Sequence, residues 1–234
     1  MKEIILKLFF IFYRTLFSIR VRLLVKKIFK FFYYWFRFFK IKTYLFFSED
    51  TVNIIIGAAL TNQKGWFSTN EEWLDISKAE HWNRLFNSKK RVKRVLAEHV
   101  FEHLTIDEMR NTLRLIFVNM INGGSLRIAV PDGNNPNSEY RKHCGINGIG
   151  ADASDHKQFL TYELLSREVE QIGFHHNLIE GYLENKELVL KKVNNNLGRV
   201  IRSRSNSINL AKKGWDFCDS NTSLIIDCFK NTIN

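Results

Sequence analysis

The sequence predicts an α/β fold, in which a mostly parallel β-sheet with helices on both faces follows an amphipathic helical arm. Beyond residue 48, short apolar runs rich in β-branched residues alternate with segments of helical periodicity, as in parallel sheets. The first 47 residues hold eleven of the 35 Lys and Arg residues, one of the 24 Asp and Glu residues and twelve of the 20 Phe residues. We therefore expect a basic aromatic arm over residues 1–47 and a domain over residues 48–234.

Residues 20–40 of the arm form two faces on a helix that turns by about 100° per residue. The basic face holds Arg20, Arg22, Lys26, Lys27, Lys30, Arg37 and Lys40, with Tyr33 and Tyr34 on the same side. The other face holds Leu24, Val25, Ile28, Phe29, Phe32, Trp35, Phe36 and Phe39. This pattern is typical of a helix in the interface of an anionic membrane. Two alternatives remain: a helix packed on its own domain, and a nucleic-acid contact, which so many Phe residues disfavour.

Charges interrupt the arm too often for a transmembrane helix, because its charge-free runs reach about six residues and a span needs roughly 18. They also disfavour a secretory signal. The three cysteines, Cys144, Cys218 and Cys228, show no C-x-x-C spacing, so they indicate neither a disulfide framework nor a thiolate zinc site. We expect a cytoplasmic protein that associates peripherally with the membrane.

Along the domain, the periodicity predicts six strands and three helices. The strands are expected at 51–59, 65–69, 90–98, 125–131, 175–184 and 222–230, the last two as antiparallel neighbours. The helices are expected at 77–86, 105–120 and 161–173. Thr105 and Glu108 have the spacing of a capping box, "NGG" at 122–124 is expected to end the second helix, and the loop 132–156 has the length of a functional loop.

Ligands of open parallel sheets bind at the carboxyl ends of the strands. Here those ends are expected at Gly57–Ala59, Asn70–Glu71, Glu98–His99 and Pro131–Gly133.

One string, "LAEHVFEHLT" at 96–105, contains the H-x-x-E-H pattern of inverted zinc peptidases between His99 and His103. Such a site needs both histidines on one helix face. His99 directly follows a predicted strand, however, and the capped helix begins only near Thr105. We therefore expect both histidines in a strand-to-helix turn and predict no metal site, with a zinc hydrolase as the least favoured alternative.

Five short sequence motifs, which follow one another in a fixed order along the domain, resemble those of a known protein family. They are "GAALTNQKGWFSTNEEWLDI", "LAEHVFEHLT", "SLRIAVPDG", "GADASDHKQF" and "NTSLIIDCFK". Over about residues 52–230 the chain resembles class I S-adenosylmethionine-dependent methyltransferases, and within them a branch of small predicted methyltransferases. The resemblance implies a Rossmann-like fold, S-adenosylmethionine as cofactor and a site built from four strand ends.

The resemblance also implies roles for individual residues. Gly57, Ala58 and Ala59 would form the turn under the methionine part of the cofactor, and Asn70 would meet the ribose hydroxyls. Asp75 and Ile76 would meet the adenine, while Glu98 and His99 would line the floor near the methionine end. The family has Gly where Ala59 stands and Asp where Asn70 stands. Each of these residues also has a structural interpretation, such as a turn for Gly57 or a helix cap for Asp75.

Transfer to a hydroxyl needs a general base, for which the sequence offers His156, then Asp155, then Asp132 near the expected cleft. Asp152 and Lys157 are expected to order the same loop. Arg202 and Arg204 could clamp an acidic acceptor or simply lie in a solvated basic loop.

The favoured function is therefore O-methylation of a glycan or lipid-linked glycan at the inner membrane face. A binding or scaffold protein that has kept the fold and lost the cofactor is the alternative.

Overall fold

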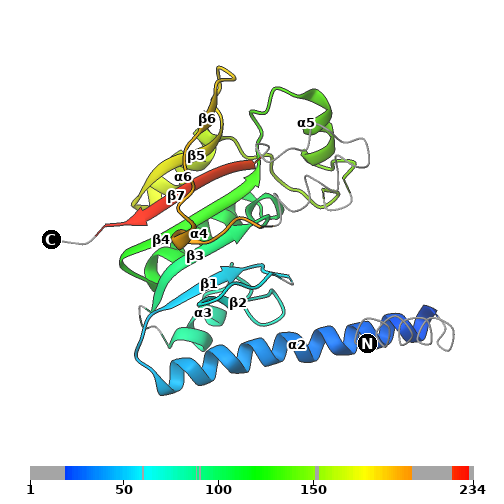
Figure 1. Ribbon diagram of the computed structural model, residues 1–234, viewed down its shortest axis with the longest axis vertical. Helices are drawn as coiled ribbons and strands as arrows, with labels where there is room; N and C mark the ends of the chain where they lie inside the picture. Colours follow the sequence, from blue (N-terminus) through cyan, green and yellow to red (C-terminus); the bar gives the residue numbers. More distant parts are fainter. Residues whose placement is uncertain are drawn as a thin grey trace, which may run out of the picture.

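The computed structural model describes residues 19–59, 61–87, 89, 91–150, 153–201 and 223–231 (Figure 1). Its sheet contains seven strands in the order β2-β1-β3-β4-β7-β5-β6. The strands are β1 (Val52–Ile56), β2 (Phe67–Ser68), β3 (Val92–Glu98), β4 (Met120–Pro131), β5 (Phe174–Tyr182), β6 (Leu188–Leu190) and β7 (Ser223–Lys230). The helices are α2 (Ile19–Phe47), α3 (Ala79–Phe86), α4 (Ile106–Asn119), α5 (Ser138–Cys144) and α6 (Tyr162–Ile172), with short 3-10 helices η1 (Phe101–His103) and η2 (Asn195–Leu197).

The first four strands of this order are parallel, and β7 inserts antiparallel between β4 and β5. The chain moves outward from β1 to β2 and then returns to β3 on the other side of β1. The sheet therefore has a topological switch point between β1 and β3, where ligands of such folds bind. The predicted Rossmann-like fold with a mostly parallel sheet is confirmed, as is the antiparallel pairing of the last two predicted strands.

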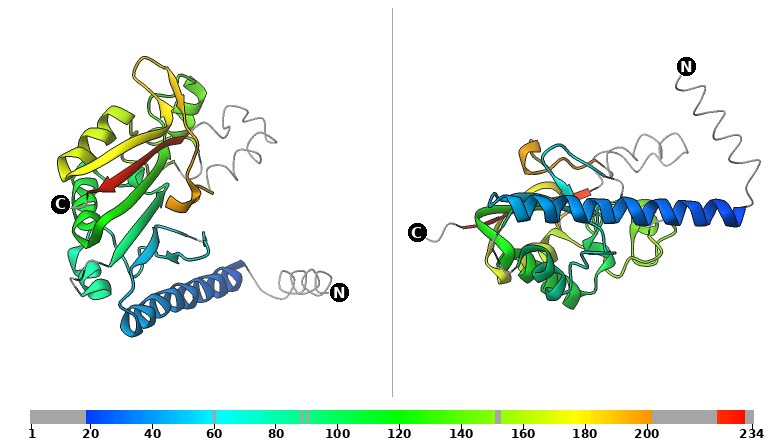
Figure 2. Two further views of the ribbon diagram at one scale, coloured as in Figure 1. Left: turned by 60° about the vertical axis from the view of Figure 1, so that its left-hand side comes forward. Right: turned by 90° about the horizontal axis from the view of Figure 1, so that it is seen from below.

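Helices α3, α4 and α6 cover one face of the sheet (Figure 2). Ile54 of β1, Ala97 of β3 and Ile128 of β4 belong to one buried cluster that also includes Leu113 of α4 and Leu165 of α6. Arg110 of α4 and Glu168 of α6 join the two helices through a 2.7 Å ion pair. This cluster forms the main core of the domain.

Among the described residues, the extended segment 191–201, which includes η2, packs on the other face of the sheet. Arg127 of β4 makes a fully buried pair with Asp227 of β7 at 2.6 Å, and its guanidinium also donates to the carbonyls of Asn194 and Gly198. A buried charge is stable only when it is paired and hydrogen-bonded, so this arginine fixes the segment to the sheet. The segment then reaches the carboxyl end of β3.

Local sequence signals explain most helix boundaries. Thr105 and Glu108 form the predicted capping box at the start of α4, and Gly173 ends α6 in a left-handed conformation. Two predictions were wrong in detail. The fourth predicted strand begins at Met120 rather than at residue 125, and residues 122–124 form a bulge inside it, since the register with β3 shifts between Met120 and Ser125. The loop 132–156 contains α5, which Asn137 caps.

The predicted arm helix appears as α2, which runs along the β2 edge of the sheet (Figures 1 and 2). Tyr34, Arg37 and Ile41 are buried on its domain side, and Phe38 contacts Trp73. Phe29, Phe32, Phe36 and Phe39 on its opposite side are exposed. None of the described helices combines the length and the apolar character that a bilayer span requires.

Candidate functional site

The turn after β1 is tight and strained. Gly57 and Ala59 both have positive φ, 54° and 47°, while Ala58 is fully buried and donates to the carbonyl of Thr69 at 2.9 Å. A Cβ on Gly57 would lie 2.7 Å from Cγ2 of Val100, so both the dihedral and the space require glycine. At Ala59 the left-handed backbone explains why glycine suits this position better. The left-handed conformation of Ala59 lowers the free energy of unfolding by about 1 kcal/mol relative to glycine.

An arginine of the arm occupies the edge of this turn. Arg37 of α2 donates to the carbonyl of Ala59 at 2.7 Å and to Oδ1 of Asn70 at 3.1 Å. It also donates to the hydroxyl of Tyr33 at 2.7 Å, which lies one helical turn earlier. The side-chain oxygen that was predicted to receive a ribose hydroxyl thus already accepts from the arm. The sequence did not indicate that Arg37 contacts this site, because no local pattern distinguishes it from the other basic residues of the arm.

Asp75 and Ile76 lie in the turn that leads to α3. The Asp75 carboxylate accepts from the backbone and hydroxyl of Ser77 and forms a 3.0 Å ion pair with Lys78. Burial raises the pKa of Asp75, but the bonds from Ser77 and Lys78 outweigh it and hold the pKa below its ordinary value. Ile76 belongs to the main core, and its carbonyl accepts from the indole of Trp82. Both residues therefore have local structural partners.

Glu98 and His99 end β3 at the switch point. Glu98 is buried, and its Oε2 accepts from the backbone N–H of Ile201 at 3.0 Å, which brings the segment 191–201 over the strand end. His99 has a φ of 54°, and its Nδ1 lies 3.0 Å from Oε1 of Glu102. The structure thus places Gly57, Asn70 and Glu98 at three adjacent strand ends, as predicted from the order of elements.

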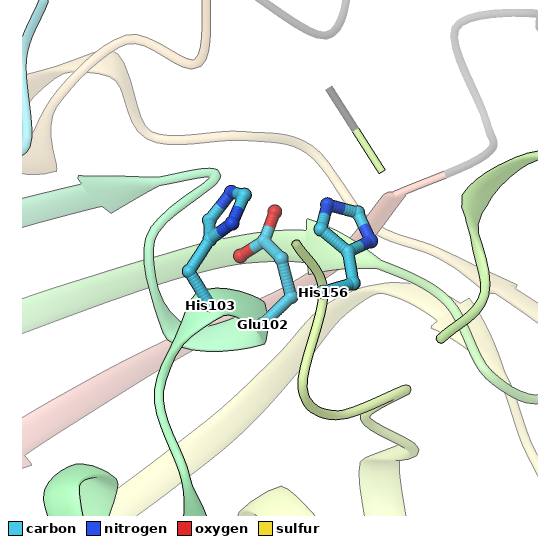
Figure 3. Close-up of side chains that lie close together, drawn as sticks. All are labelled: Glu102, His103 and His156. Carbon is cyan, nitrogen blue, oxygen red and sulfur yellow. The ribbon is translucent and has the colours of Figure 1, made fainter. Parts of the chain in front are cut away.

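Beside this edge, Glu102, His103 and His156 form a polar cluster (Figure 3). One ligating atom from each residue lies within 4.8 Å of the others. The two imidazole rings contact each other edge to face, with centroids 4.7 Å apart, and the Glu102 carboxylate lies close to both in the view of Figure 3. Burial by itself raises the pKa of Glu102, but the hydrogen bond and charge of His99 keep the pKa below its ordinary value. We call these three residues the Glu102–His103–His156 cluster.

The loop that carries His156 is fastened to η1 and to the start of α4. The backbone N–H groups of Lys157 and Gln158 both donate to the carbonyl of Glu102, at 2.8 and 3.1 Å. The Lys157 ammonium also reaches Glu108 at 3.0 Å. Asp155 is exposed and lies 3.1 Å from Nδ1 of His103, close enough for an ion pair but without hydrogen-bond alignment. Two of the three predicted base candidates thus meet next to the end of β3.

The third base candidate, Asp132, lies apart from them at the end of β4. It is fully buried, and its carboxylate accepts from the backbone N–H groups of Tyr182 and Asn134 at 2.6 and 2.9 Å. Burial raises the pKa of Asp132 to about 6 against the effect of these bonds, and the charge of Glu163 adds to the rise. Its position indicates a structural contact between β4 and β5. Asp152, Arg202 and Arg204 lie outside the described residues.

The H-x-x-E-H string does not have the geometry of an inverted zinc peptidase. Its residues lie in the strand-to-helix turn, as predicted, and of its two histidines only His103 joins the cluster, together with Glu102. His99 contacts Glu102 from the other side, and Glu102 is buried rather than placed as a solvent-accessible base. The third member, His156, lies far downstream, so the string alone could not reveal the cluster.

Comparisons with known protein families and with curated proteins give no match. Solved structures do show a likeness. A SAM-dependent methyltransferase from Archaeoglobus fulgidus is 16% identical over 82% of this chain and 90% of its own, with a TM-score of 0.43. A possible histamine N-methyltransferase from Thermotoga maritima is 11% identical over 90% and 97%, with a TM-score of 0.43. An O-methyltransferase family protein from Burkholderia thailandensis is 9% identical over 84% and 56%, with a TM-score of 0.46, so the chain spans about half of its length. The fold assignment rests on the strand order itself.

Proposed function

We propose that the protein is an S-adenosylmethionine-dependent methyltransferase that methylates a hydroxyl of a glycan or lipid-linked glycan at the inner membrane face. The observation that carries the proposal is the switch point between β1 and β3. There a strand ends in a left-handed glycine turn at Gly57, and the neighbouring strand ends in a buried acid, Glu98. Ligands of open parallel sheets bind at such strand ends, and a strand-end acid can accept their hydrogen bonds.

The donor set at this edge fits the cofactor. Gly57 and Ala58 would support its methionine part, Asn70 would accept from a ribose hydroxyl, and Glu98 would lie beneath. When bound, the cofactor supplies a methyl group already activated on a sulfonium. The protein's own contribution is then largely alignment of the acceptor with that methyl group.

An alcohol acceptor must lose its proton to a base. Of the three candidates, Asp155 combines a position next to the β3 end with an accessible carboxylate, 74% exposed. Asp132 is engaged by backbone groups, and the His156 ring is buried within the cluster. We assign the base to Asp155.

Methyl transfer from labelled cofactor to a membrane-derived glycolipid fraction tests this assignment. We expect label in the acceptor with the wild-type chain, and a loss of at least tenfold with Asp155→Asn while cofactor affinity is unchanged. Asp107→Asn, at another exposed aspartate in the first turn of α4, is the matched control. Equal transfer by all three proteins would remove the base role of Asp155. No transfer to any fraction, despite cofactor binding, would remove the glycan acceptor.

Exposed aromatic side chains on α2 support the membrane part of the proposal. Phe29, Phe32, Phe36 and Phe39 recur with helical spacing and point away from the domain, and each is at least 59% exposed. Leaving such a row of rings in water is costly, because a buried Phe gains roughly 2–3 kcal/mol. Lys30 and Lys40 lie on the same helix, and basic residues near an anionic leaflet contribute about 1 kcal/mol each. We therefore infer that this face lies in the interface of an anionic membrane.

Vesicle sedimentation tests this inference. The full chain should sediment with vesicles that contain phosphatidylserine at low salt, and much less with neutral phosphatidylcholine vesicles. Replacing the four Phe residues by Ser should abolish sedimentation, whereas Ile146→Ser/Ile149→Ser, at exposed apolar residues outside the arm, should leave it intact. Equal sedimentation of both variants would exclude α2 as the membrane contact.

A second candidate function rests on the contact of Arg37 with Asn70. Because the arm already uses the acceptor oxygen of Asn70, and Ala59 keeps a strained turn, a binding protein with this fold that has lost its cofactor also explains the site. The two functions differ in one measurable property, cofactor affinity.

A further inference from the structure

The Glu102–His103–His156 cluster has unsatisfied polar atoms in a buried position. Glu102 is 1% exposed, and among the described residues its Oε2 has no hydrogen-bond partner. Nδ1 of His103 has no hydrogen-bond partner there either, although the Asp155 carboxylate lies 3.1 Å from it. Buried polar atoms are nearly always paired, and leaving one unpaired costs about 1–3 kcal/mol. Two such atoms in one cluster of potential metal-ligating side chains indicate that the cluster binds a ligand.

The third residue of the cluster is oriented for ligation. Nδ1 of His156 lies 2.8 Å from the carbonyl of Cys144, and only a protonated nitrogen can donate to a carbonyl. In the neutral ring, Nε2 therefore carries the lone pair. A histidine that ligates a metal is commonly held in this way by a carbonyl or carboxylate at its other nitrogen. In Figure 3 one ring nitrogen of His156 faces the Glu102 carboxylate.

We propose that Glu102, His103 and His156 bind a divalent first-row transition metal ion, with zinc as the best match. Two imidazole nitrogens and one carboxylate oxygen suit zinc and its neighbours, whereas magnesium and calcium prefer oxygen ligands throughout. Ligands at about 2.0–2.2 Å from tetrahedral zinc lie roughly 3.4 Å apart, so the three side chains need to close in from their present spacing of up to 4.8 Å. A water molecule can complete the tetrahedron, because the His103 side chain is 31% exposed.

The ion would join two distant parts of the chain. Glu102 and His103 belong to η1 after β3, and His156 belongs to the loop that already donates two backbone hydrogen bonds to Glu102. Metal binding would therefore fix the loop that holds Asp155 against the end of β3. It would also take the Nε2 lone pair of His156, which leaves the base role to Asp155. This inference does not depend on the cofactor, since no cofactor-site residue is a ligand.

Zinc titration of the metal-free full-length chain by calorimetry, without S-adenosylmethionine, tests the proposal. We expect one ion per chain, and a loss of affinity of at least tenfold in each of Glu102→Gln, His103→Ala and His156→Ala. The control variant His175→Ala/His176→Ala removes two histidines of β5 that lie outside the cluster and should bind zinc as the wild type does. Circular dichroism reports whether each variant is folded.

X-ray absorption of the zinc-loaded wild-type protein gives a measurement that needs no variant. We expect two imidazole nitrogens among four light-atom ligands. A stoichiometry well below one per chain, a first shell without two imidazoles, or equal losses in the cluster and control variants would each overturn the proposal. Cofactor binding without zinc binding would reject the metal site alone. Zinc binding without cofactor binding would reject the methyltransferase function alone.

Discussion

Two neighbouring regions at the carboxyl edge of the sheet satisfy their polar groups in different ways. At the ends of β1 and β2, Asn70 and the carbonyl of Ala59 are both engaged by Arg37 of the arm. Just beyond the end of β3, the Glu102–His103–His156 cluster leaves Glu102 Oε2 and His103 Nδ1 without hydrogen-bond partners among the described residues. In the first region, the polar groups already accept hydrogen bonds from Arg37 of the same chain. In the second region, two polar atoms are available to bind a ligand.

The difference suggests that the two regions bind ligands at different cost. A cation can enter the cluster by small side-chain movements, because the donors already face one another. A cofactor at β1 and β2 has to share or replace the contacts of Arg37, so its affinity is coupled to the position of α2. The arm would then influence the cofactor site as well as the membrane.

The largest expected effect concerns Gly57 and tests how tightly the β1 turn is built. Gly57→Ala should lower the free energy of unfolding by about 3 kcal/mol, from a left-handed alanine at about 1 kcal/mol and the clash with Val100. Gly65→Ala is the matched control, because Gly65 also has positive φ but no atom lies within 4 Å of its added Cβ. It should cost about 1 kcal/mol. Equal losses in urea unfolding would show that Val100 does not restrict the turn.

Asp132, at the end of β4, accepts hydrogen bonds from two backbone N–H groups, but its burial disfavours the charged carboxylate. Its folded-state pKa of about 6 lies above the ordinary 3.8, so its protonated form is favoured in the folded protein. Asp132 therefore contributes fully to the free energy of unfolding below about pH 4, and this contribution is lost as the pH rises through 6. The loss amounts to about 3 kcal/mol, at about 1.4 kcal/mol per pKa unit. Glu163 and Lys186 are the charged groups that act on it.

Asp132→Asn should remove this decline, measured as the difference in unfolding free energy between pH 4 and pH 7. Asp107→Asn, at an exposed aspartate, serves as the control and should keep the wild-type decline. An unchanged decline in Asp132→Asn would contradict the raised pKa.

The smallest expected effect concerns Arg37 and tests whether its contact with Asn70 limits cofactor binding at the ends of β1 and β2. Arg37→Met should free Oδ1 of Asn70 and raise the affinity for S-adenosylhomocysteine several-fold, or about 1 kcal/mol. Lys30→Met is the control on the same helix, since the exposed Lys30 contacts Glu72 and the ring of Tyr34. Loss of binding in Arg37→Met would show instead that Arg37 belongs to the cofactor site.

The sequence predicted what depends on local chemistry. The capping box at Thr105, the glycine end of α6 and the order of strands and helices along the chain all follow from propensities and periodicity that act over a few residues. The strand-end position of Gly57, Asn70 and Glu98 followed from that order. The short α5 escaped prediction because its seven residues are stabilised chiefly by the Asn137 cap and by packing of Tyr140.

Contacts between distant segments could not be predicted in the same way. Arg37 lies 33 residues before Asn70 in the chain, and no local pattern links an arm helix to the end of β2. His156 joins Glu102 and His103 only because the loop folds back onto η1. The sequence correctly placed the H-x-x-E-H string in a turn, but the third residue of the cluster required the tertiary structure.

Calorimetric titration with S-adenosylhomocysteine tests the central claim most directly. The wild-type chain and the double variant Ala59→Gly/Asn70→Asp, which relieves the left-handed alanine and restores an acid at the β2 end, are titrated side by side. The account predicts one site per chain in both, with tighter binding in the variant. Absence of heat from both proteins at concentrations of about a millimolar would contradict a cofactor site at the switch point between β1 and β3.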